Sequence, residues 1–82
     1  MELETCAAII EMQKHSRLSK SEISRRLSRS ETFLTSSLQR GGSMRADLLA
    51  QIADICDFEL VLVSKNDSHD PIVILPSKAE EA

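Results

Sequence analysis

The chain has 82 residues, of which 41% are hydrophobic and 28% are charged, and its net charge is −3. This length corresponds to one domain, and this share of apolar residues argues against a wholly disordered chain. No stretch approaches the roughly 18 apolar residues that a membrane-spanning helix needs. Glu2 and Glu4 stand where a secretory signal carries basic residues. We therefore expect one small cytoplasmic domain.

The first predicted element is an amphipathic helix over residues 3–15, a stretch with good helix formers and no Gly or Pro. The two cysteines of the chain, Cys6 and Cys56, lie in apolar helical patterns and not in a CxxC pair. We interpret them as reduced core thiols, although sequence spacing alone leaves a disulfide open.

A second, shorter helix is predicted to begin at Ser19, because Ser19 and Glu22 have the spacing of a capping box. In that motif the side chain of each residue binds the backbone amide of the other. Ile23 and Leu27 then form the buried edge of the helix, and Ser24 is expected to face elsewhere. A helix this short needs neighbours to hold it.

A third helix follows, and either Ser28 or Ser30 caps its start. Leu34 and Leu38 form its buried edge, and the Gly pair at residues 41–42 ends it. Its other residues are small or polar and are expected on the outside: Glu31, Thr32, Thr35, Ser36, Ser37 and Gln39.

The strongest helical pattern covers residues 44–57, after which the period changes from helical to extended. "FELVLVSK" and "PIVILP" are rich in Val, Ile and Leu, and the polar turn "NDSHD" separates them. These residues, 59–76, predict a β-hairpin, or one strand followed by an extended tail. Residues 77–82 are expected to be a flexible tail.

Both faces of the predicted strands are apolar, so one face can cover the helices while the other needs a second partner. An isolated hairpin with an open edge is also marginally stable and adhesive. A symmetric homodimer joined through the strands solves both problems. Its expected interface residues are Leu60, Val61, Leu62, Val63, Ile72 and Ile74.

The charges are distributed unevenly along the chain. Residues 14–45 carry eight basic and two acidic side chains, a net charge of +6, whereas the rest carries two basic and eleven acidic ones, a net charge of −9. A basic middle inside an acidic chain indicates a face made for a polyanion.

Residues 18–58 resemble the Cro/repressor type of helix-turn-helix protein, the XRE family. The matching stretches are "LSKSEISRRLSRS", the Leu34…Leu38 helix that ends in "RGG", and "LLAQIADICDFELVL", which is similar to the end of many small phage and mobile-element regulators. The resemblance implies a mainly α fold: a four- to five-helix lambda-repressor-like domain over residues 1–58, with the motif at about 19–40, followed by a C-terminal strand or hairpin.

Two positions depart from the family pattern. Ser28 stands where family members often carry Gly, and because Ser disfavours a left-handed backbone we expect a different turn there. Leu34 and Leu38 also lie one residue farther apart than the usual apolar pair of the recognition helix.

The resemblance implies a DNA-binding transcriptional regulator, a dimeric repressor that binds double-stranded DNA at a two-fold operator in a bacterial or phage-infected cell. An alternative is a protein-interaction module, such as an antitoxin or a phage-encoded inhibitor. If the chain is a DNA-binding regulator, the third helix is expected to contact base edges through Glu31, Thr32, Thr35 and Ser36. The phosphate contacts are expected from Lys20, Arg29, Arg40, Ser43 and Arg45.

Catalysis has little support in the sequence. His15 and His69 are far apart, and neither paired carboxylates nor a Gly-rich phosphate loop is present. Asp67, His69 and Asp70 fit a polar turn better than a metal site. We expect no enzymatic activity, no cofactor and no metal.

Overall fold

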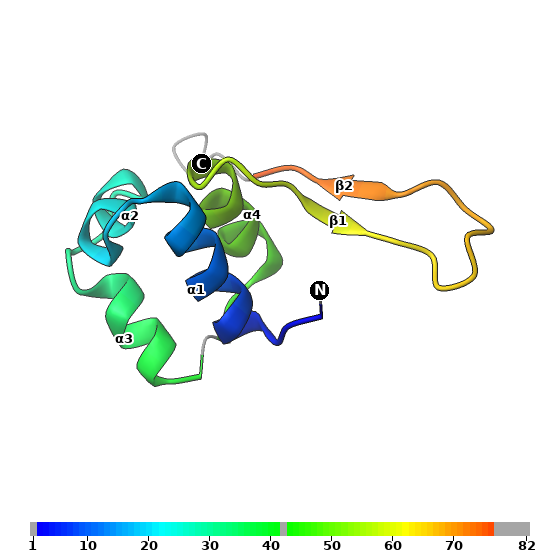
Figure 1. Cartoon of the computed structure of the whole chain (residues 1–82). Coiled ribbons are helices and arrows are strands. Elements are labelled where there is room, and N and C mark those ends of the chain that lie inside the picture. Colours follow the sequence, from blue (N-terminus) through cyan, green and yellow to red (C-terminus); the bar gives the residue numbers. More distant parts are fainter. Residues whose placement is uncertain (1, 42, 77–82) are drawn as a thin grey trace.

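The structure is a computed structural model that describes residues 2–41 and 43–76. These residues form four helices followed by a two-stranded antiparallel sheet (Figure 1). The elements are α1 (Thr5–Ser16), α2 (Lys20–Arg26), α3 (Phe33–Gln39), α4 (Ala46–Ile55), β1 (Leu60–Leu62) and β2 (Ile72–Ile74). The prediction of a mainly helical domain with a C-terminal hairpin is confirmed, and the alternative of a single strand with an extended tail is wrong. Gly42 and the predicted tail at 77–82 lie outside the described residues.

The core lies where the four helices meet, and every helix contributes to it. Ile9 of α1, Ile23 of α2, Leu34 of α3 and Ile52 of α4 are fully buried, and Cys56 follows α4. Burial of each such aliphatic side chain stabilises the fold by about 1.5–3 kcal/mol. Both cysteines are free, as predicted, but only Cys56 belongs to the buried core, whereas Cys6 is half-buried.

A buried serine joins α2 to α3. Ser24 was expected to face away from the core, but its side chain is completely buried. Its hydroxyl donates to the carbonyl of Lys20 at 2.8 Å and accepts from the amide of Leu34 at 3.0 Å. Because amides in the first turn of a helix have no partner within that helix, Ser24 supplies from α2 the acceptor that the start of α3 needs.

The helix ends differ in part from the predicted ones. Ser19 caps α2 as expected, with its hydroxyl accepting from the Glu22 amide at 3.0 Å. Neither the Ser28 nor the Ser30 side chain caps α3, so both of those alternatives are wrong: the helix begins later, at Phe33, and Ser30 contributes only its carbonyl to the Phe33 amide. After α3 the chain turns at Gly41, whose φ of 97° favours glycine.

The hairpin projects away from the helical body and contacts α4 only at its base (Figure 1). Leu60 pairs with Ile74, Val61 with Val73 and Leu62 with Ile72. The expectation that one face of the strands covers the helices is therefore wrong beyond the base. Of the expected interface residues, Leu60, Val61 and Ile74 are half-buried, whereas Leu62, Val63 and Ile72 are exposed. None of the described helices is long and apolar enough to cross a membrane.

We expect Ser24→Ala to lower the free energy of unfolding by about 1–3 kcal/mol, because it leaves the buried Leu34 amide without an acceptor. Urea unfolding followed by circular dichroism measures this change. Ser21→Ala is the matched control, since Ser21 lies in the same helix and is only half-buried. Equal stability of the two variants would contradict the role of Ser24.

Candidate nucleic-acid interface

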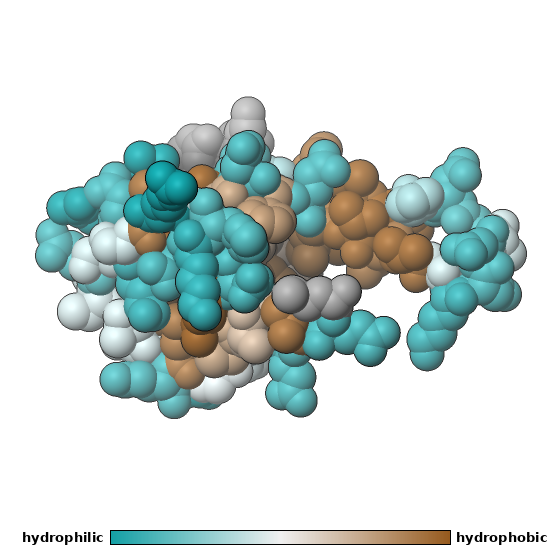
Figure 2. Space-filling view, viewed as in Figure 1, coloured by the Kyte–Doolittle hydropathy of each residue, from teal (hydrophilic) through white to brown (hydrophobic). Residues whose placement is uncertain are grey.

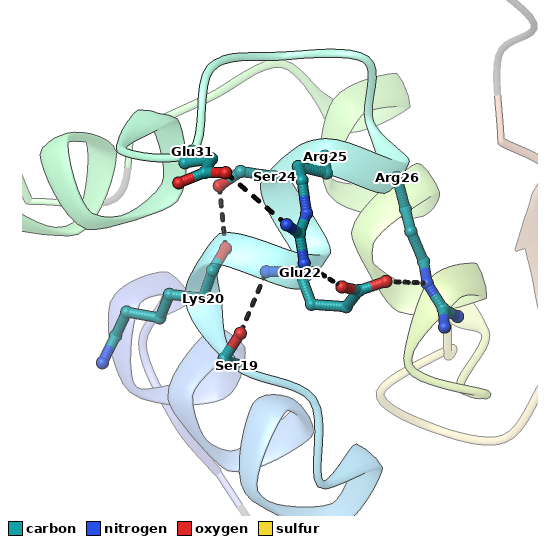
Figure 3. Close-up of polar contacts among 7 residues, drawn as sticks. All are labelled: Ser19, Lys20, Glu22, Ser24, Arg25, Arg26 and Glu31. Atoms are coloured by element: carbon teal, nitrogen blue, oxygen red, sulfur yellow. Dashed lines mark hydrogen bonds and ion pairs between the residues drawn. The ribbon is translucent and has the colours of Figure 1, made fainter.

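The start of α2 carries a carboxylate held by two arginines (Figure 3). Glu22 was expected to return a hydrogen bond to the Ser19 amide, and this half of the capping box is wrong. Its side chain turns instead along the helix to Arg25 and Arg26, with Arg26 Nε donating at 3.1 Å. The hydrogen bond from Arg25, followed by that from Arg26, lowers the pKa of Glu22 below its ordinary value.

These ion pairs decide which basic side chains remain available to a ligand. Arg25 also approaches Glu31, at 3.5 Å, so both acidic residues of the 19–40 segment are engaged by arginine. The pKa of Arg25 is raised, chiefly by its hydrogen bond to Glu22. Arg25 and Arg26 are therefore partly neutralised by carboxylates of the same chain, and Glu31 has an intramolecular partner.

The turn between α2 and α3 adopts the left-handed backbone that serine disfavours. Ser28 has φ of 61°, so the expectation of a different turn is wrong. The amides on both sides are held: that of Ser28 donates to the Arg25 carbonyl at 2.9 Å, and that of Arg29 donates to the Ser24 carbonyl at 3.0 Å. These bonds hold the serine in this conformation.

Arg29 leaves the turn over an aromatic ring. Its guanidinium carbon lies 4.8 Å from the centroid of Phe33, which is a cation–π contact. Phe33 begins α3, so the contact places a positive charge beside the start of that helix. Arg29 itself is exposed.

Three of the five expected phosphate-binding residues have no acidic partner within residues 2–41 and 43–76: Lys20, Arg29 and Arg40. Lys20 is the first residue of α2, and its side chain points away from the Glu22 cluster (Figure 3). Arg40 follows α3 directly and is exposed. The unpaired charges thus stand at the start, the turn and the end of the α2–α3 pair.

The other two expected phosphate ligands lie beyond this pair. Ser43 is exposed in the connection to α4. Arg45 directly precedes α4, and its guanidinium donates to the Asp47 carboxylate at 3.2 Å. Because 85% of the Arg45 side chain is exposed, this pair is weak and Arg45 remains accessible.

The four expected base-contacting residues are divided between α3 and the turn before it. Glu31 and Thr32 are exposed but precede the helix, whereas Thr35 is exposed on α3 and Ser36 is half-buried there. The fifth polar position of the pattern, Ser37, is buried, so its predicted exposure is wrong.

One residue that was expected on the outside of this helix was not among the expected base contacts. Gln39 is exposed, and with Thr32, Thr35 and Ser36 it completes the i, i+3, i+4, i+7 spacing of one helix face. The same spacing could have identified Gln39 as a base contact. It was left out because base contacts were expected only from the first turns of the helix, and Gln39 lies at its end. It adds a longer side chain with an amide to a surface of short hydroxyls.

No protein-family model, curated protein or solved structure matches this chain. Among the described residues, no group of three His, Cys, Asp or Glu side chains is placed to hold a metal ion. The function is therefore inferred from the geometry of α2 and α3.

The carboxylate of Glu22 makes stability depend on pH. Because its pKa is lower in the folded protein than in the unfolded chain, it stabilises the fold above the ordinary glutamate pKa of about 4.3. This contribution disappears as the pH falls through the folded-state pKa. We therefore expect Glu22→Gln to unfold at lower temperature than the wild type at neutral pH, with a difference that narrows in acid.

Thermal melts between neutral and acidic pH measure this difference. Glu2→Gln is the control, because Glu2 is exposed and has no ion pair within the described part of the chain. A gap between wild type and Glu22→Gln that stays constant with pH would contradict the assignment.

Proposed function

We propose that this chain is a sequence-specific DNA-binding transcriptional regulator of the Cro/repressor helix-turn-helix type, acting in the cytoplasm. In this proposal α2 and α3 are the motif, and α3 enters the major groove. The observation that supports it most is the charge arrangement of this pair: its two carboxylates are engaged by arginines, while Lys20, Arg29 and Arg40 have no acidic partner among the described residues. Such a surface attracts a backbone of phosphates.

The outer surface of α3 suits close approach to base edges. Thr32, Thr35 and Ser36 have short hydroxyl side chains that pair with several bases, and Thr methyl groups contact thymine methyls. Gln39 is the longest of the set, and its amide can pair with adenine in two places. Because this surface has few long side chains that could reach base edges, sequence-dependent DNA shape supplies part of the specificity in this proposal.

Charge neutralisation tests the phosphate contacts. Replacing Lys20, Arg29 or Arg40 singly by Ala is expected to weaken binding to all duplexes alike. Each variant lowers the slope of log K against log salt by about 1, because one fewer counterion is released. Fluorescence anisotropy over a salt series measures both quantities.

Arg26→Ala is the matched control, because Glu22 already engages the Arg26 guanidinium. It removes the same charge from the same pair of helices and is expected to leave the slope nearly unchanged. Slopes that are identical for all four variants and the wild type would contradict the phosphate assignment.

A repressor at a two-fold operator predicts a symmetric binding site. Selection of bound duplexes from a random pool is expected to recover two half-sites whose centres lie about 34 Å apart, one turn of DNA. Recovery of no enriched sequence would contradict sequence-specific binding. Absence of DNA binding even at low salt, with a basic protein co-purifying, would favour the alternative, an interaction module such as an antitoxin or a phage-encoded inhibitor.

A further inference from the structure

The exposed apolar surface of this protein is concentrated on the hairpin. Six of the seven large apolar side chains that are exposed in the described residues lie between positions 58 and 75. Leu62, Val63, Ile72 and Leu75 are each more than half exposed. Figure 2 shows a brown, hydrophobic area on the hairpin between the helical body and a polar tip. Apolar surface gathered in this way marks an interaction site, whereas singly scattered residues do not.

The two edges of the hairpin differ in their capacity to pair. Strand β2 lies between Pro71 and Pro76, which have no amide hydrogen to donate, so a ladder on this edge is confined to residues 72–75. The β1 side runs from Phe58 to Lys65 without Pro or Gly. Beyond its base this strand also projects clear of the helices (Figure 1). The free edge that invites another strand is therefore that of β1.

We propose that β1 pairs antiparallel with β1 of a second copy of this chain, around a two-fold axis at Leu62. The product is a four-stranded sheet with the order β2, β1, β1, β2 across the dimer. A two-fold axis normal to the sheet keeps each side chain on the same face in both copies. Because side chains alternate between faces along a strand, such an axis must pass through a residue pair and not between two residues. This requirement leaves few registers to compare.

Among the registers that place Glu59 opposite a charged residue of the second copy, charge selects the one centred on Leu62. Centred on Leu62, the pairing places Glu59 opposite Lys65 of the second copy, twice per dimer, and Val61 opposite Val63. Centred on Val63, it would place Glu59 opposite Asp67 of the second copy, which is repulsive. Glu59 and Lys65 are both exposed and have no ion-pair partner among the described residues of their own chain. Opposite charges across antiparallel strands attract, and like charges repel.

This inference deepens the proposed function, because a two-fold operator requires two copies of the α2–α3 surface. It rests on the hairpin alone, however, and its test uses no DNA. Failure of the dimer and failure of DNA binding are therefore separate results.

Charge exchange tests the register. Sedimentation equilibrium of the full chain is expected to give a dimer. Glu59→Lys and Lys65→Glu each turn two attractive contacts into repulsive ones, and each is expected to raise the dimer dissociation constant roughly tenfold. The double variant Glu59→Lys/Lys65→Glu restores the attraction and returns the constant toward that of the wild type. Lys14→Glu, the same charge change as Lys65→Glu but on α1, is the control and leaves the dissociation constant unchanged.

Mixing the two single variants gives a result that does not depend on either forming a homodimer. One then presents two lysines and the other two glutamates along β1, so the pair is expected to form a heterodimer more tightly than either variant self-associates. Circular dichroism shows that each variant is folded. A monomeric wild type at submillimolar concentration would overturn the proposal, as would a dimer that is insensitive to the single changes or not restored by the double change.

Discussion

The hydroxyl of Ser24 is the polar contact on which the arrangement of α2 and α3 depends. It accepts a hydrogen bond from the Leu34 amide at 3.0 Å, and Ser24 is completely buried. A buried amide without an acceptor costs more than an ordinary hydrogen bond contributes, so this contact favours the position of α3 in which the Ser24 hydroxyl reaches the amide. The angle between the two helices, and the direction of the Thr35 face, follow from that contact together with the packing of Ile23 and Leu34.

In the same pair of helices, some charged side chains form ion pairs within the protein, whereas others have no ion-pair partner among the described residues. Glu22 draws Arg25 and Arg26 along α2, and Arg25 reaches Glu31 across the turn. These exposed pairs contribute little to stability individually. Their larger effect is on the surface charge, because the negative charges of Glu22 and Glu31 are offset by neighbouring arginines. The basic side chains that have no acidic partner among the described residues then make the electrostatic potential of this surface positive.

Local spacing was sufficient to predict the Ser19 cap and the buried positions Ile23 and Leu34, because periodicity and capping act within a few residues. It was not sufficient for Ser24 or Ser37, since a serine is buried only where another helix supplies a partner or covers it. Glu22 was within reach of both the Ser19 amide and two arginines, and the sequence contains the signal for each. Only the assembled helix decides between them. The left-handed Ser28 likewise follows from the joining of α2 to α3 and not from its own preference.

The distribution of apolar side chains connects the small core to the hairpin. The helices bury Ile9, Ile23, Leu34 and Ile52 without any fully buried aromatic ring in the described residues, so the core is compact but limited in area. A domain of this size gains little further stability from within itself. Six of the seven exposed large apolar residues in the described chain lie between positions 58 and 75, in and around a two-stranded sheet that is marginal in water. In the proposed dimer, pairing along the β1 edge would give these strands neighbours, and it would join two α2–α3 surfaces through residues outside the proposed DNA contacts.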